Sequence, residues 1–427
     1  MKTIAALITV IILAAVEAWA YTEVSGTINS QTWTPAGSPY LLTGSVTVSA
    51  GATLVIQPGV EVKAGNGRKL IILGGLVAHG TADQPIRFTA SATGWAGIEF
   101  NAADGACEIS HAVIEMVTSG SAIEANNSHV NVSRVKLHNN TGTYVIRLRN
   151  SANVSLDYST IHDNSVNTVL YSGSAGDGAV LRNILFANNT CSRRVIYFTS
   201  SASLSLLNST FAMNLIGTYN RGVLWVGSSA LIRNCLFQGN RTTSNAIADI
   251  YYGGTSERPT LYHCVLEQPS YAGSTVLCRF GASTFVNPTI APGKISMLPG
   301  TDNGEPADYR QTAGSLGVGA GNNAYVSGLP TDLLGQPRIH NGTVDAGCYE
   351  YVPQYAGGVS ASVRQAVFIS SPSEVGKTYR FWYTDDLASG HWIVLGDAQP
   401  GTGSIIGVYD TPGNARSRIY RVVETQH

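Results

Sequence analysis

Two histidines on consecutive sequence repeats have the spacing in this chain that best suits acid–base chemistry. His138 and His162 occupy equivalent positions in their repeats, and Asp163 directly follows the second histidine. Arg147 and Arg149 come from the strand that is predicted between them. Histidine, aspartate and arginine on one face would be able to remove a proton beside a uronic acid, as in a polysaccharide lyase. The alternative is a solvated polar face that carries two ordinary histidines.

A second candidate site consists of aromatic residues that recur about once in each repeat. If these side chains point outward, they form a flat strip suited to stacking on sugar rings. If they point inward, they belong to the core. The alternation around them is ambiguous and favours core or mixed positions. The aromatic residues are Tyr144, Tyr171, Tyr197, Trp225 and Tyr251.

Other catalytic and metal-binding patterns are missing from the sequence. Polygalacturonase-like hydrolysis needs paired carboxylates at a fixed separation, but the adjacent pair Asp385–Asp386 fits a turn near the C-terminus. The chain has no C-x-x-C pair and no Cys/His spacing typical of zinc. We therefore expect no metal and no cofactor. Only the lyase alternative would require Ca²⁺, held by clustered carboxylates.

The elements that must position these residues are the coils of a solenoid. A column of asparagines recurs every 24 to 26 residues, each three residues after a large apolar side chain. A period in the twenties, made of short strand-like pieces, is typical of a solenoid in which each repeat is one coil. The asparagines are Asn140, Asn164, Asn189, Asn214 and Asn240, and the apolar column is Ile114, Leu137, Ile161, Phe186, Phe211, Phe237 and Leu266.

The asparagines have a structural explanation. Asparagine tolerates the left-handed region at a tight corner and bonds to local backbone groups. Side-chain amides stacked on successive coils can also bond to one another along the axis. The alternative, a row of ligand-binding amides, would place function on the same column.

The six cysteines include one pair that the repeat alignment places on adjacent coils. Cys235 and Cys264 both lie two residues before the apolar column. Neighbouring strands are separated by about 4.8 Å, which is close to disulfide range. The pair is therefore a possible disulfide, and the alternative is two buried thiols that act as small hydrophobic groups.

The N-terminus and the composition point to export. Residues 1–20 combine a basic start, a short apolar run and a small-x-small site, which is typical of a secretory signal peptide. The alternative is an uncleaved anchor; no other run is long enough to cross a membrane. Charged residues make up 12% of the chain and its net charge is −1. That composition argues against nucleic acid as a partner, and we expect a secreted or cell-surface monomer.

Residues 44–100 carry a motif with a recognisable relative. The segment Gly75–Phe88 reads G-L-V-A-H-G-T…P-I-R-F, and Trp95–Phe100 reads W-A-G-I-E-F. This stretch resembles the N-terminal coils of secreted right-handed parallel β-helix proteins. The resemblance implies an all-β, single-stranded β-helix over residues 21–352, with N-terminal coils at 44–106, regular coils at 107–280 and a closing segment at 281–352.

A second motif lies in the closing segment. Asp332–Arg338 reads D-L-L-G-Q-P-R, and Asp345–Glu350 reads D-A-G-C-Y-E. The segment is similar to the signature of bacterial surface β-helices of the choice-of-anchor Q type, with Cys348 where alanine is usual. In that family the motif marks architecture rather than chemistry. From the residues alone, Asp345 and Arg338 are expected to form a buried pair that closes the end of the solenoid.

The last part of the chain has a different pattern. Residues 353–358 read as a linker. Short alternating strands separated by turn residues follow in 359–427, which predicts a small β-sandwich module. We expect an exported bacterial protein without catalytic activity that acts in glycan binding or adhesion. The alternative is a polysaccharide lyase or glycoside hydrolase acting on an acidic polysaccharide.

Overall fold

The computed structural model describes residues 21–91, 94–199, 201–217, 222–227, 229–251, 258–293, 306–353, 367–385, 391–410 and 418–425. The predicted signal peptide, linker residues 354–358 and sandwich residues 359–366 lie outside these ranges. The described residues form two compact units, one ending at Pro353 and one beginning beyond it. Among them, no helix is long and apolar enough to cross a membrane.

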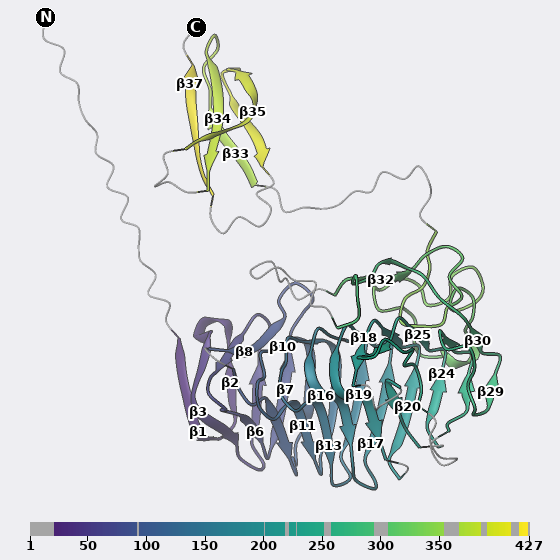
Figure 1. The fold of residues 1–427 in the computed structure, drawn as a ribbon. Coiled ribbons are helices and arrows are strands. Elements are labelled where there is room, and N and C mark those ends of the chain that lie inside the picture. Colours follow the sequence, from purple (N-terminus) through teal and green to yellow (C-terminus); the bar gives the residue numbers. More distant parts are fainter. Residues whose placement is uncertain are drawn as a thin grey trace, which may run out of the picture. The chain divides into compact units, whose positions relative to one another are not determined.

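The first unit is a solenoid whose strands stack in three parallel ladders (Figure 1). In the first ladder, each coil pairs in register with the coils on either side of it. Its strands are β2 (Gln31–Trp33), β4 (Thr53–Ile56), β7 (Gly75–His79), the start of β10 (Cys107–Glu115), the start of β12 (His129–His138), β14 (Asn153–Asp157), β17 (Gly178–Arg182), β20 (Ser203–Leu207), β24 (Leu231–Arg233), β27 (Leu261–Tyr262) and β29 (Thr275–Val276).

The second ladder carries the apolar column of the sequence repeats. Leu137 pairs with Ile161, and the same register continues through Phe186 and Phe211. Its strands are the start of β1 (Thr22–Ile28), whose end joins the third ladder, the start of β3 (Tyr40–Val48), β5 (Glu61–Ala64), β8 (Ile86–Ala90), the ends of β10 and β12, β15 (Thr160–His162), β18 (Leu185–Ala187), β21 (Thr210–Ala212), β25 (Leu236–Gln238), β28 (Val265–Leu266) and β30 (Arg279–Phe280).

The third ladder carries the aromatic residues. Tyr171 pairs with Tyr197, and Tyr197 pairs with Trp225. Its strands are the end of β3, β6 (Leu70–Ile72), β9 (Ile98–Asn101), β11 (Ser121–Asn126), β13 (Tyr144–Arg149), β16 (Ser165–Ser172), β19 (Thr190–Phe198), β22 (Leu215–Ile216), β23 (Leu224–Trp225) and β26 (Arg241–Thr242).

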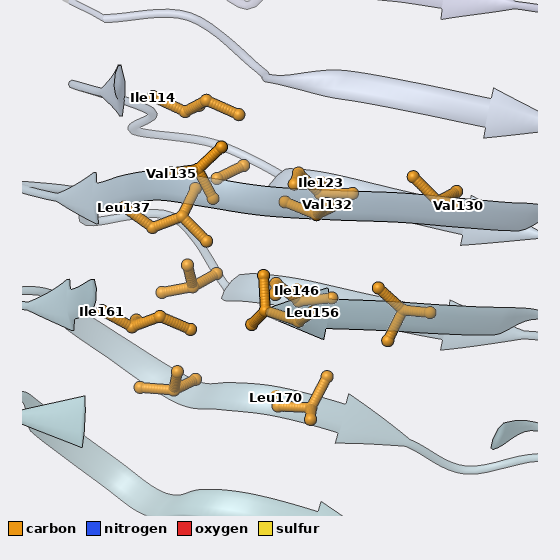
Figure 2. Close-up of a cluster of buried hydrophobic side chains, with 14 of the residues drawn as sticks. Ile114, Ile123, Val130, Val132, Val135, Leu137, Ile146, Leu156, Ile161 and Leu170 are labelled. Atoms are coloured by element: carbon orange, nitrogen blue, oxygen red, sulfur yellow. The ribbon is translucent and has the colours of Figure 1, made fainter. Parts of the chain in front are cut away.

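The interior of the solenoid is a continuous apolar core. Figure 2 shows how aliphatic side chains from successive coils, among them Leu137 and Ile161, fill the space between the ladders. Farther along, the rings of Phe186, Phe211 and Phe237 stack with centroids 4.6 and 4.8 Å apart. A single coil could not bury such a face, but stacking buries it and pairs the backbone groups. The predicted all-β solenoid and its apolar column are therefore confirmed.

Left-handed residues turn the chain at the corners of the solenoid. Between the first and second ladders, each of these residues has a φ between 45° and 57°. Asparagine and histidine tolerate this region better than branched residues do. The corner consists of His111, Arg134, Tyr158, Asn183, Asn208, Asn234, His263 and Leu277.

The closing segment, described at residues 281–293 and 306–352, follows the last coil of the solenoid. It contains β31 (Phe285–Asn287), β32 (Asp308–Gln311) and the short helix η4 (Asn323–Tyr325); another short helix, η1 (Pro35–Gly37), lies near the N-terminus. Residues of the closing segment pack on the outward side of the second ladder, where Tyr309 and Tyr349 share a buried cluster with Leu185 and Ala212.

The second unit consists of two antiparallel sheets. Phe381 of one sheet and Ile406 of the other share a small buried cluster, as in the sandwich predicted for this region. Its described strands are β33 (Val367–Pro372), β34 (Thr378–Thr384), β35 (Ile393–Pro400), β36 (Ile405–Asp410) and β37 (Ile419–Thr425).

Candidate functional site

The two candidate histidines lie side by side on the outward side of the second ladder. His138 ends β12 and His162 ends β15, and the two residues pair in register. Their rings stack with centroids 5.2 Å apart. His162 Nδ1 lies 2.7 Å from Asp163 Oδ2, and the Asn188 amide donates to the other oxygen of Asp163. The register therefore brings His138, His162 and Asp163 together, as the repeat alignment expects.

The histidine cluster is enclosed on the solenoid. His138 Nε2 lies 3.6 Å from Glu115 Oε2, and Thr89 donates a hydrogen bond of 2.7 Å to the same carboxylate. The exposed fraction is 6% or less for His138, His162, Asp163 and Glu115. A general base must reach the proton that it removes, and a polymer chain cannot reach a group with this degree of burial. The cluster suits a structural polar network better than catalysis.

The two candidate arginines are on a different ladder from the histidines. Arg147 and Arg149 belong to β13, where both face the carboxylate of Glu124. The nearest atoms are 3.6 Å from Glu124 Oε1 for Arg147 and 3.2 Å for Arg149. The structure therefore does not combine these arginines with the histidines in one site. They belong to the ladder that carries the aromatic residues.

All five candidate aromatic residues lie outside the apolar core. Each aromatic residue is half-buried. At least one residue directly next to it in the chain belongs to the buried core. Consecutive rings contact one another along the solenoid axis, with centroids between 4.7 and 5.6 Å apart. We call this column, Tyr144, Tyr171, Tyr197, Trp225 and Tyr251, the aromatic strip.

The rings of the aromatic strip are not a flat platform. Tyr171 is nearly parallel to Tyr144 and Tyr197, so these rings cover one another's faces and direct their edges to solvent. Trp225 is turned by 76° relative to Tyr197. The Arg194 guanidinium lies 4.6 Å from the centroid of Trp225, a distance typical of a cation–π contact. The strip therefore offers ring edges and phenol hydroxyl groups more than open ring faces.

The asparagine column forms an unbroken ladder of amides. Each Nδ2 donates to Oδ1 of the next asparagine at 2.9 to 3.0 Å, from Asn140 through to Asn240. Each Oδ1 also accepts a backbone N–H from the preceding coil. The exposed fractions are between 0 and 2%, so these amides bond to the fold and are not presented to a ligand.

The left-handed conformation lies one residue earlier than the sequence analysis expects. Asn139, Asp163, Asn188 and Met213 have φ values of 53°, and Gly239 has one of 71°. The ladder asparagines themselves are not among the residues with positive φ. The residue before each ladder asparagine therefore makes the corner. The asparagine side chain then points into the β-helix, where its amide bonds along the solenoid axis.

Comparison with known protein families agrees with this geometry. Residues 121–290 match the family model described as the right handed beta helix region. The solenoid is a right-handed parallel β-helix. The chain matches no curated protein and no solved structure in the other two comparisons.

The β-helix contains a second asparagine column that the sequence analysis missed. Asn183, Asn208 and Asn234 lie at the corner between the first and second ladders, and they anchor the closing segment. Asn183 donates to Thr331 O, and Asn208 donates to Asp345 O. The sequence contains a pattern that could have revealed this column. Each of these asparagines precedes a phenylalanine of the apolar column by three residues.

The closing segment holds a buried ion pair that differs from the expected one. Arg338 Nε lies 3.5 Å from Glu350 Oε1, and both side chains are almost fully buried. Asp345 instead accepts backbone bonds from Gly319 and Tyr351. Burial raises the pKa of Glu350 to about 8, although Arg338 acts in the opposite direction. The segment covers the side of the β-helix rather than closing its end.

The cysteines of the β-helix are free thiols in the structure. The strand register places Cys235 beside Cys264, as the repeat alignment expects. It also places Cys278 beside Cys264 on the other side. The sequence alignment missed Cys278 because the last coil is much shorter than the others. The three thiols form one column at the C-terminal end of the β-helix.

Among the described residues, no group of three or more His, Cys, Asp or Glu side chains is placed to hold a metal ion.

Proposed function

We propose that this chain is an exported bacterial β-helix of the choice-of-anchor Q type that binds polysaccharide outside the cell without catalysing its cleavage. The observation that carries this proposal is the aromatic strip. The aromatic rings of successive coils contact one another on the outward side of the third ladder, where each residue is half-buried. An extended column along a rigid solenoid fits an extended polymer better than a small ligand.

The chemistry of the strip suits a sugar chain. Ring edges and a rotated tryptophan provide apolar contact, and phenol hydroxyl groups provide hydrogen bonds beside it. Gly173 leaves room for the Tyr171 hydroxyl, because a Cβ at this position would lie 2.6 Å from it. Arg147 and Arg149 add charged donors on the coil of Tyr144, where Arg147 pairs in register with Tyr171. Neutral sugar hydroxyls and acidic groups would both find partners along this face.

Binding is favoured over catalysis because the acid–base groups are enclosed. The His162–Asp163 pair is the arrangement that a lyase would need, but both side chains are buried. The closing segment packs on the same ladder one and two coils farther along, where Tyr309 shares a buried cluster with Ala187 and Ala212. We propose that this polar network helps to hold the β-helix together.

Export is part of the same proposal. The signal-like residues 1–20 and the low charge of the chain support it. N-terminal sequencing of protein recovered outside the producing cell is expected to begin at Tyr21. Retention of Met1 in the recovered protein would contradict the proposed cleavage.

A glycan array with the folded chain tests the binding proposal. We expect binding to at least one polysaccharide, and a loss of at least tenfold in affinity for Trp225→Ala and for Tyr197→Ala. Tyr262→Ala is the matched control, because Tyr262 is also half-buried and outward but lies on the first ladder. Equal affinities in all four proteins would refute the role of the strip.

The same polysaccharides are then incubated with the protein, and unsaturated uronates are followed by absorbance. No increase is expected under a binding function. An increase that disappears in His162→Ala would overturn the proposal and favour a lyase.

A further inference from the structure

Three cysteines lie in line at the C-terminal end of the β-helix. In the register of the last coils, Ile232 pairs with Leu261 and Leu261 pairs with Thr275. The same offsets superpose Cys235, Cys264 and Cys278 on consecutive coils. Cys264 lies in the middle, and its thiol interacts with those of Cys235 and Cys278 on either side. Stacked coils repeat at about 4.8 Å, within the usual Cα separation of a disulfide.

In two earlier coils, serine occupies the position of these cysteines. Its hydrogen bonds show which bonds the reduced thiols can make. Ser159 Oγ donates to Asp157 O and accepts the Val135 N–H. Ser209 makes the equivalent bonds to Leu207 O and Ile184 N. Cys278 Sγ likewise accepts the Cys264 N–H at 3.4 Å. The thiols therefore replace serine hydroxyls, so serine is a conservative substitute at all three positions.

The two outer thiols differ in how accessible and how movable they are. Cys235 is fully buried between complete coils, whereas Cys278 is partly exposed. The strands that flank Cys278, β29 and β30, have two residues each and, among the described strands, pair with neighbours on one side only. The final coil can therefore shift to reach disulfide geometry more easily than the coil that holds Cys235.

We propose that Cys264 and Cys278 form a disulfide that fastens the last coil to the β-helix, and that Cys235 remains a thiol. With glutathione disulfide as oxidant, the Cys278 thiolate attacks one sulfur and releases one glutathione. The Cys264 thiolate then attacks the Cys278 sulfur of the mixed disulfide and releases the second glutathione. Together the two cysteines lose two electrons and two protons. The two released glutathione molecules take up all of them. Because the hydrogen bond with the Cys264 thiol and burial raise the pKa of Cys278, the reaction accelerates as the pH rises.

Peptide mapping of the folded chain after treatment with glutathione disulfide tests this pairing. Cleavage after Arg, Lys and Glu puts the three cysteines on separate peptides, 234–241, 258–267 and 268–279. We expect 258–267 linked to 268–279, with 234–241 carrying a free thiol. A majority of 234–241 linked to 258–267 overturns the proposal, and so do free thiols in all three peptides.

Serine variants show whether loss of the disulfide results from removal of a thiol or from failure to fold. Cys235→Ser is expected to keep the link and Cys278→Ser to lose it, and both proteins should fold because serine is native at this position in earlier coils. Oxidation should slow amide hydrogen exchange in the last coil on the order of 100-fold, the effect of closing a loop of this size. Unchanged exchange after oxidation would contradict a fastening role.

Discussion

Replacing Asn189 with alanine should reveal how much stability the amide ladder provides. Asn189 Oδ1 accepts bonds from Asn164 N and Nδ2 at 3.2 and 2.9 Å. Its Nδ2 donates to Ile161 O at 2.9 Å and to Asn214 Oδ1 at 3.0 Å. The asparagine is fully buried, with an exposed fraction of 0%, so bulk water does not replace these partners.

The size of the effect follows from the groups that lose their partner. The Asn164 N–H and the Ile161 carbonyl both lose the bond they make to Asn189, whereas Asn214 Oδ1 keeps the bond from the Asn189 backbone. An unsatisfied buried group costs about 1 to 3 kcal/mol. Asn189→Ala is therefore expected to lower the free energy of unfolding by about 4 kcal/mol. Asn164 Nδ2 retains two other acceptors and adds little.

Urea unfolding followed by circular dichroism measures this loss, with Asn167→Ala as the control. Asn167 also uses its amide oxygen, which accepts from Ser192, but this bond is at the surface. We expect the control to lie within about 0.5 kcal/mol of the parent chain. A loss for Asn189→Ala no larger than the control's would refute the view that the ladder stabilises the coils.

Three further effects are expected elsewhere in the chain. Burial raises the pKa of Asp249 to about 6, so its contribution is greatest below pH 4. As the pH rises from 4 to 6, stability should fall by at most about 3 kcal/mol, and Asp249→Asn should remove this slope in unfolding curves. Phe211→Ala should cost about 3 to 5 kcal/mol in urea unfolding, since it empties the middle of a ring stack. Above pH 8, where Glu350 is ionised, Arg338→Met should cost a similar amount by leaving that carboxylate buried without its cation, and Glu350→Gln in the same chain should recover part of it.

The repeat alignment predicted the coils because one periodic column is enough to set the register. Leu137, Ile161, Phe186 and Phe211 are paired in the structure in the order that the sequence aligned them. That alignment also brought His138 beside His162. A period read from sequence fixes axial neighbours, since parallel strands in register place equivalent residues one above the other.

Orientation across the strand was harder to predict. In β13, Val145 and Ile146 are both fully buried although they are consecutive. This interrupts the alternation that would have shown Tyr144 to be outward.

The enclosure of the histidine face could not be read from the repeats either. The residues that cover the second ladder, Tyr309 and Tyr349, come from a segment far along the chain. The sequence could therefore align the candidate site but not predict its accessibility.

The direction of the amide ladder has a consequence for the length of the molecule. Its first acceptor, Asn140 Oδ1, is satisfied by the Val117 backbone, and its last donor, Asn240 Nδ2, is satisfied by the Asp249 carboxylate. Every link between them is interchangeable, because each asparagine receives from one neighbour and gives to the next. Whole coils can therefore be duplicated or deleted between these two terminators without leaving an amide unmatched. The two terminating bonds define the ends of the ladder, but the number of coils between them is not set by the amides. The outward faces of the solenoid can therefore lengthen one coil at a time.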